Sequence, residues 1–104
     1  MNNRLERPPQ DSLEKARQAA QEIKDAWRES VERIEDRLAY PSAYGITERK
    51  AKRLVEQREI LRAKLDGRQF PGKAARKHFS RSIGYKLTKS DLRQAFNVRP
   101  DTII

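Results

Sequence analysis

Cysteine is absent from the 104-residue sequence, so the chain can form neither a disulfide nor a thiolate metal site. Histidine occurs once, at His78, and no separate orienting carboxylate lies near it in the sequence. Neither a metal-binding cluster nor a Ser-His-Asp triad is therefore indicated. The four glycines do not form a phosphate-binding loop. We expect a protein that is not an enzyme and that holds no cofactor and no metal.

Long apolar runs are also absent. A membrane-spanning helix needs about 18 consecutive apolar residues or more, and no such run occurs. Residues 1–10 lack the apolar stretch of a signal peptide. A cysteine-free chain suits a reducing compartment, so we expect a soluble, cytoplasmic protein with no membrane partner.

Hydrophobic residues are few. They make up 36% of the chain, charged residues make up 38%, and the mean hydropathy is −1.02. Such a chain buries only a thin apolar seam between its elements, and we expect an elongated shape. A length of 104 residues leaves room for one domain.

The pattern that is present is helical. Between residues 11 and 39, apolar residues recur at steps of three and four, which predicts one long helix with an apolar seam. The seam consists of Leu13, Ala16, Ala20, Ile23, Trp27, Val31, Ile34 and Leu38. Pro41 and Gly45 then predict a break, and Thr47 is placed to cap a new helix.

Three shorter helices are predicted after the break. The first runs from Glu48 to about Asp66 and ends before Gly67, which suits the left-handed position that follows a helix. Its apolar stripe comprises Ala51, Leu54, Val55, Leu61 and Leu65, with Ile60 off the stripe. The second covers about residues 73–83, and the third has Ser90 as its cap and continues to Phe96.

These elements predict an all-α fold, a long antiparallel helical hairpin followed by two short C-terminal helices. Within one domain, residues 1–10 are a flexible N-terminal arm, residues 11–67 the helical hairpin and residues 68–104 a basic C-terminal helical segment. We expect Trp27 in the core. Tyr40 and Tyr44 flank the turn, where they either close it or form a small contact patch.

The net charge of +9 is concentrated near the C-terminus. Residues 11–40 carry six basic and eight acidic side chains, whereas residues 68–104 carry nine basic and two acidic ones. Seven cations lie between residues 68 and 89 without an intervening carboxylate, a pattern that indicates contact with phosphates. They are Arg68, Lys73, Arg76, Lys77, Arg81, Lys86 and Lys89. The four from Lys73 to Arg81 are spaced to form one helical stripe.

Aromatic residues and hydroxyls are interleaved with these cations. Ser80 and Ser82 are placed to add hydroxyl contacts to phosphate. Two interpretations of the aromatic residues are open. In the first they stack on exposed bases; in the second, which we favour, they form a core that closes the open end of the hairpin. If the aromatic residues form a core, the cations either contact a ligand or are simply solvated. The residues concerned are Phe70, Phe79 and Tyr85, together with Ile83.

The segment from Ser90 to Ile104 resembles the first helix and turn of a helix-turn-helix. Apolar and cap-like positions are held by Leu92, Phe96, Val98, Thr102 and Ile103, and Asn97 stands where the turn usually has glycine. The segment ends where a recognition helix would begin, so we do not expect it to read bases. Three interpretations remain open: chance similarity, packing on its own hairpin, or completion of a helix supplied elsewhere.

The sequence predicts a non-catalytic nucleic-acid-binding protein that contacts DNA or RNA through phosphates, with slight sequence preference. The alternative is a helical interaction factor, such as an adaptor, assembly factor or inhibitor, that docks on an acidic protein surface. Small basic helical proteins of this kind occur among accessory proteins of phages and mobile elements. An exposed apolar patch with Ile60, Trp27 or Ile103-Ile104 would favour that alternative. A homodimer through the hairpin is a third possibility.

Overall fold

A computed structural model describes residues 10–84 and 88–102. In this part of the chain the regular structure consists of four helices: α1 (Gln10–Ala39), α2 (Glu48–Leu65), α3 (Lys73–Ile83) and α4 (Lys89–Ala95). The predicted all-α class is confirmed. Residues 1–9 of the arm predicted at 1–10 lie outside the described residues, and its last residue, Gln10, begins α1. Tyr85, Lys86 and Ile103-Ile104 also lie outside the described residues, and the side chain of Leu13 is likewise not described.

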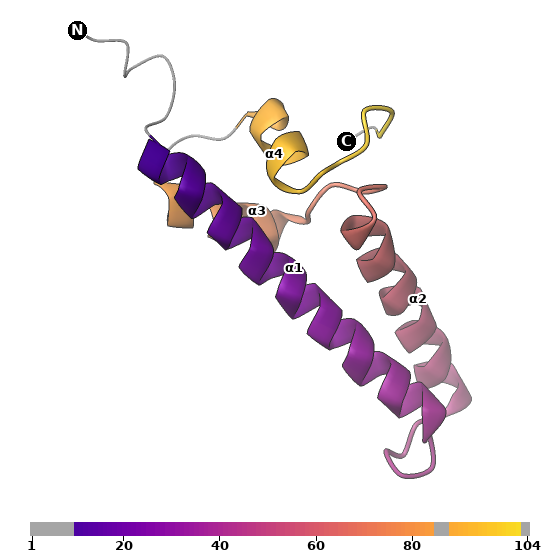
Figure 1. The fold of residues 1–104 in the computed structure, drawn as a ribbon. Coiled ribbons are helices and arrows are strands. Elements are labelled where there is room, and N and C mark those ends of the chain that lie inside the picture. Colours follow the sequence, from indigo (N-terminus) through magenta and orange to yellow (C-terminus); the bar gives the residue numbers. More distant parts are fainter. Residues whose placement is uncertain (1–9, 85–87, 103–104) are drawn as a thin grey trace, which may run out of the picture.

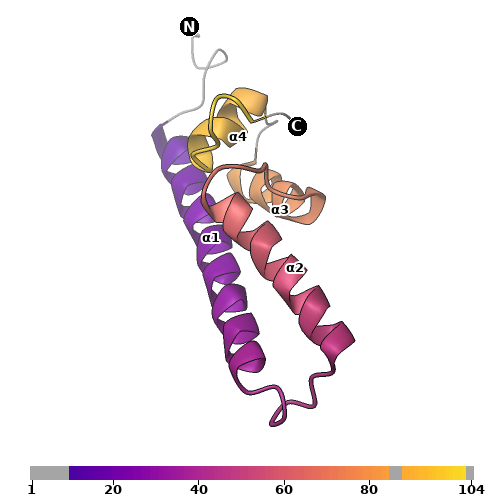
Figure 2. The same ribbon diagram turned by 90° about the vertical axis from the view of Figure 1, so that its right-hand side faces the viewer.

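The molecule is long and thin, with extents of 64 × 26 × 17 Å. The helices α1 and α2 are joined by the loop at residues 40–47 and run in opposite directions (Figures 1 and 2). The short helices α3 and α4 lie at the other end, where both pack against α1. The loop and the two short helices therefore occupy opposite ends of the molecule.

Local signals set the helix ends. The Thr47 hydroxyl accepts a hydrogen bond from the Lys50 N–H at 3.2 Å, as expected for the predicted cap of α2. At the other end of α2, Gly67 has a φ of 75°, and the Arg68 N–H donates to the Ala63 carbonyl at 2.9 Å. The left-handed turn predicted at Gly67 is confirmed.

The start of α4 differs from the prediction. The cap is Thr88, not Ser90: the Thr88 hydroxyl accepts from the Asp91 N–H, and the Asp91 carboxylate accepts from the Thr88 N–H at 3.0 Å. This reciprocal pair satisfies two backbone donors, whereas a cap at Ser90 would satisfy fewer. The helix therefore begins one residue before Ser90.

The core lies at the end of the molecule where α3 and α4 cover the N-terminal half of α1. Phe79 and Phe96 are each 1% exposed, and their rings meet edge to face with centroids 5.2 Å apart. Trp27 is half-buried and packs on Phe96 at 5.8 Å between ring centroids. The other buried members are Ala16, Ala19, Ala20, Ile23, Phe70, Ile83, Leu92 and Val98. The predictions of Trp27, Phe70, Phe79 and Ile83 as core residues are confirmed.

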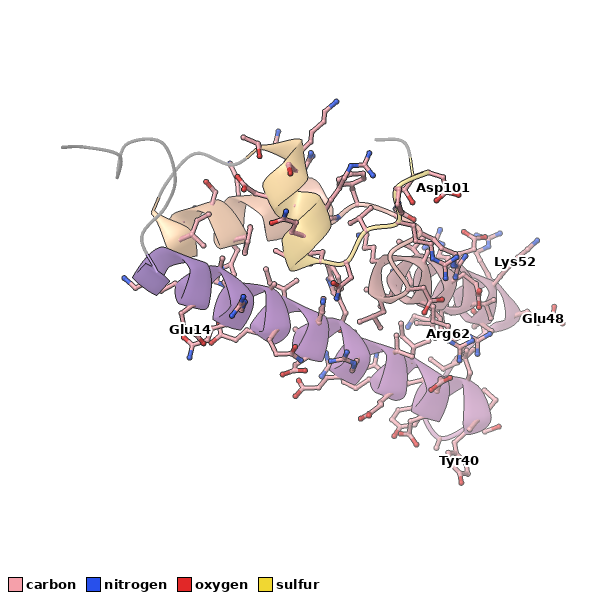
Figure 3. All side chains as sticks on the ribbon, turned by 45° about the horizontal axis from the view of Figure 1, so that its top comes forward. Glu14, Tyr40, Glu48, Lys52, Arg62 and Asp101 are labelled. Carbon is pink, nitrogen blue, oxygen red and sulfur yellow. The ribbon has the colours of Figure 1, made fainter. Side chains whose placement is uncertain are left out.

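The contact between α1 and α2 buries fewer side chains than this core does. No residue of α2 is fully buried, so the predicted seam does not close along its whole length. Arg62, labelled in Figure 3, forms an ion pair with Glu35. The Lys64 ammonium lies 5.8 Å from the centroid of the Trp27 ring. The first half of the α1 seam, from Ala16 to Ile23, packs on α3, α4 and the tail that follows them, and Trp27 contacts both this core and Lys64 of α2.

The apolar stripe of α2 also differs at one position. Val55 is 38% exposed, and the inward position between Leu54 and Leu61 is taken by Arg58, whose side chain is 25% exposed. Val55 lies four residues after Ala51 and Arg58 lies four residues after Leu54, so both satisfy a helical spacing within the stripe. The methylene stem of arginine covers apolar surface well. Ile60 lies off the stripe and is 46% exposed.

The loop is tied to α1 by Tyr44. Its hydroxyl donates a hydrogen bond to the Asp36 carboxylate, which raises the pKa of Tyr44 above its ordinary value. Tyr40 is 63% exposed. Of the two tyrosines that flank the turn, Tyr44 therefore closes it.

The chain after α4 returns to the end of α2. Asn97 adopts a φ of 52°, as its glycine-like place in the turn implied, and the Gly67 carbonyl accepts from the Arg99 N–H at 2.8 Å. The Arg93 guanidinium donates to the carbonyls of Arg99, Pro100 and Thr102. Residues 98–102 form no second helix, so of the three interpretations the structure favours packing of this segment on its own helices.

Candidate nucleic-acid interface

An open groove of about 510 Å³ lies between α3 and the start of α4. Four of its seven lining residues are cations and two carry hydroxyls. The lining residues of this α3–α4 groove are Lys73, Arg76, Lys77, Ser80, Thr88, Lys89 and Leu92. Positive charge from two helices thus converges on one concave surface.

The amphipathic pattern of α3 orients its cations. Phe79 and Ile83, four residues apart, are buried and fix the inward side of the helix. The groove-lining residues of α3 recur at steps of three, one and three, so they share one flank beside that buried side. Packing of two apolar side chains therefore determines where the cations point.

The charges on α3 work against the stability of the helix. Its first turn has no acidic residue, and Lys73 is its first residue, at the positive end of the helix dipole. Cations near a helix start are disfavoured, and Arg76 and Lys77 follow in the next turn. Helix stability therefore does not explain this arrangement of charges.

Two residues of the α4 side have defined roles. The cap at Thr88 fixes the start of the helix, which places Lys89 at the rim of the groove. Leu92 is 6% exposed and supplies an apolar floor. The carboxylate of Asp91 is held by the backbone of Thr88 and is not among the lining residues.

The structure brings together four of the seven predicted cations, namely Lys73, Arg76, Lys77 and Lys89. Arg81 is exposed on α3 but does not line the groove, so the predicted stripe is split. Arg68 is engaged in an ion pair with Asp66 at 3.1 Å. Lys86 lies outside the described residues.

The two serines also differ. Ser80 lines the groove, whereas the Ser82 hydroxyl donates to the His78 carbonyl at 2.9 Å. Sequence reasoning missed Thr88 and Leu92 as groove residues, although the Thr-x-x-Asp pattern at 88–91 was a usable signal for the helix start.

The groove keeps its full positive charge. Within residues 14–84 and 88–102, none of its four cations forms an ion pair with a carboxylate. Because unpaired charges in a concave surface concentrate the electric field, the groove attracts anions more strongly than the same charges on a flat surface. Phosphate oxygens are well matched to this set, since arginine binds them with two parallel hydrogen bonds and lysine binds them as a point charge.

Comparisons with known proteins give no match to a family model, to a curated protein or to a solved structure. Two further properties concern the described residues only. No group of three potential metal-binding side chains comes together there, and no helix there has the length and apolar character to cross a membrane.

Proposed function

We propose that this chain is a non-catalytic nucleic-acid-binding protein whose α3–α4 groove holds backbone phosphates. The observation that carries the proposal is the convergence of Lys73, Arg76, Lys77 and Lys89 on one groove that is lined by no carboxylate of the residues that the structure describes. In this proposal α1 and α2 act as an antiparallel hairpin that supports the groove. We place this function in the cytoplasm.

The open shape of the groove favours a polymer over a small anion. A nucleic-acid backbone presents several phosphates in succession, and neutralising them releases condensed counterions, which drives binding. The aromatic residues Phe70, Phe79 and Phe96 are buried and take no part in stacking on bases. Contacts are therefore expected mainly with phosphates, with slight sequence preference.

A salt titration tests the proposal. Binding of the full chain to duplex DNA, single-stranded DNA and structured RNA is measured by fluorescence anisotropy over a range of salt concentrations. Four phosphate contacts in the groove alone give a slope of about −3.6 for log K against log salt on duplex DNA. The variant Arg76→Glu/Lys77→Glu/Lys89→Glu should weaken binding by about ten-fold or more and make the slope less steep by about 2.7.

A matched variant controls for net charge. Lys15, Arg17 and Arg33 are exposed on α1, and their replacement by glutamate changes the charge by the same amount. This variant should bind nearly as the wild type does. Equal losses in both variants, or a salt-independent affinity, would contradict the groove as the binding site. Circular dichroism confirms that both variants remain helical.

One observation favours a second function, the helical interaction factor. A shallow depression of about 280 Å³ lies between α1 and α2 and contains exposed Ile60 beside Ile34 and Leu61. Such an apolar depression suits a protein partner or a second copy of the chain. Absence of binding to all three nucleic acids at low salt would favour this function, and sedimentation at two concentrations tests self-association.

A further inference from the structure

A second concave basic surface lies at the opposite end of the molecule. A pocket of about 270 Å³ forms where the loop at 40–47 meets the ends of the two long helices. Its lining residues are Arg37, Tyr44, Ile46, Lys50 and Leu54. Figures 1 and 2 show this loop far from α3 and α4.

Two further cations of α2 lie close in sequence to the pocket residue Lys50, although they do not line the pocket. Arg49 and Arg53 are exposed, lie four residues apart and thus share one side of α2, next to Lys50. In the described part of the chain, none of these three forms an ion pair with a carboxylate, and neither does Arg37. Together, Arg37, Arg49, Lys50 and Arg53 are called the distal basic cluster.

Acidic side chains near the cluster do not neutralise it. Asp36 accepts the hydrogen bond of Tyr44. Glu48, at the start of α2, projects away from the body of the molecule, as does the nearby cation Lys52 (Figure 3). Neither of these two carboxylates forms an ion pair with a cation of the distal basic cluster.

The side chain of Lys50 does not take part in the cap of α2. Two helices of this chain begin with a threonine cap, and in α4 the residue three positions later is Asp91, which completes the reciprocal cap. In α2 the equivalent position is Lys50, whose side chain lines the distal pocket instead. An acidic or amide side chain there would satisfy one more backbone donor.

The helix dipole is a second reason why cations at the start of α2 do not stabilise the helix. Arg49 and Lys50 lie in the first turn of α2, after the acidic Glu48, where the dipole is positive and cations are disfavoured, and Arg53 follows in the second turn. The same conflict occurs in α3, where the cations line the α3–α4 groove. Both ends of the molecule thus place cations where helix stability would favour acids.

We propose that the distal basic cluster is a second phosphate-binding site and that the protein bridges two nucleic-acid segments, one at each end. The inference rests on the proposed function of the α3–α4 groove. It goes further, because two sites at opposite ends of a 64 Å molecule bind two separate segments.

A capture experiment with short duplexes tests the bridge. Duplexes of 12 base pairs, each about 41 Å long at about 3.4 Å per pair, keep the contact of any one duplex with the protein short. One duplex is immobilised on beads and a second carries a fluorophore. The wild type should recruit the fluorescent duplex to the beads.

The test variant is Arg49→Glu/Lys50→Glu/Arg53→Glu. All three glutamates fall in the first turns of α2, where the dipole favours them, so the variant should remain folded. It should still bind a single duplex through the groove but recruit at most about one tenth as much of the second duplex. The Lys15/Arg17/Arg33 triple glutamate variant serves as the matched control and should recruit as the wild type does.

The outcomes separate the two proposals. Wild-type recruitment by the distal variant would overturn the bridge and leave the groove proposal standing. Wild-type binding by the Arg76/Lys77/Lys89 variant would overturn the groove proposal. Sedimentation of every variant completes the test, because a change from dimer to monomer in the distal variant would assign the bridging to paired copies and overturn the inference.

Discussion

The carbonyl oxygen of Asn97 occupies the space where a β-carbon on Gly67 would lie. Both residues are in the left-handed region, with φ of 75° at Gly67 and 52° at Asn97. The Arg99 N–H and the Thr102 hydroxyl, at 2.8 and 3.2 Å, both donate to the Gly67 carbonyl. The end of α2 and the turn after α4 are therefore joined at a point that admits only glycine.

The first prediction concerns this junction. Gly67→Ala should lower the free energy of unfolding by about 2–4 kcal/mol, because a left-handed alanine is strained and its β-carbon displaces the Asn97 backbone. Gly45→Ala is the control: its φ is 62°, but nothing lies within 4 Å, so only about 1 kcal/mol should be lost. Urea unfolding measures both, and equal losses would show that the contact with Asn97 is unimportant.

The second prediction concerns the core. Phe79→Ala should cost about 3–5 kcal/mol, since the ring is 1% exposed and packs on Phe96. Removal of the Phe79 ring should also abolish binding at the α3–α4 groove, because Phe79 orients α3. Val55→Ala, at a 38% exposed residue, should change stability by less than about 0.5 kcal/mol. A Phe79→Ala protein with wild-type stability would contradict the assigned core.

The third prediction concerns the cap of α2. Lys50→Glu should raise the free energy of unfolding by about 0.5 kcal/mol, because it completes the cap begun by Thr47 and suits the helix dipole. Lys50→Gln tests the cap without the added negative charge. Thermal unfolding at low salt measures both variants, and a lower melting temperature in both would be inconsistent with the cap geometry.

The fourth prediction concerns pH. The Tyr44 hydroxyl donates to Asp36, so the pKa of Tyr44 is raised above its ordinary value of 10.0. The interaction requires the phenol proton, so its stabilisation is fully present below the unfolded-state pKa and is lost as the pH rises through the higher folded-state value. Tyrosine absorbance titrations of the wild type and of Asp36→Asn measure the difference. An unchanged titration in Asp36→Asn would contradict a hydrogen bond from Tyr44 to Asp36. The Tyr44→Phe variant identifies which part of the total absorbance change belongs to Tyr44.

Local chemistry made the helix boundaries predictable. Thr47 and Gly67 each determine an end through backbone hydrogen bonds within a few residues, and such signals are written in the sequence. The error at Ser90 has the same local origin, because Ser90 and Thr88 both suit a cap and only the partner Asp91 decides between them.

Packing between helices was less predictable. Periodicity shows which side of α1 is apolar but not which helix covers it, and its first half meets α3 and α4 rather than α2. In α2, the spacing from Ala51 permits Val55 on the inward side and the spacing from Leu54 permits Arg58, and the structure places Arg58 there. Such choices depend on contacts between residues distant in sequence.

In the candidate site, too, the local pattern was predictable from the sequence and the packing between helices was not. The run of cations from Lys73 to Lys89 was visible as a charge pattern, but the groove requires the placement of α4 beside α3. The distal basic cluster escaped sequence reasoning because Arg37 lies on α1 and Lys50 on α2, separated by the loop. A lysine where a cap would favour glutamate was the signal that pointed to it.

The hydrogen bonds to Gly67 make residues 68–98 an excursion that leaves and returns to the same carbonyl. Closing such a loop costs chain entropy that the contacts of α3 and α4 recover only when both are in place. The two short helices should therefore form together as one cooperative unit, and the groove between them should have no half-assembled state. Hydrogen exchange would show this as equal protection of α3 and α4, with lower protection in the lightly packed α2.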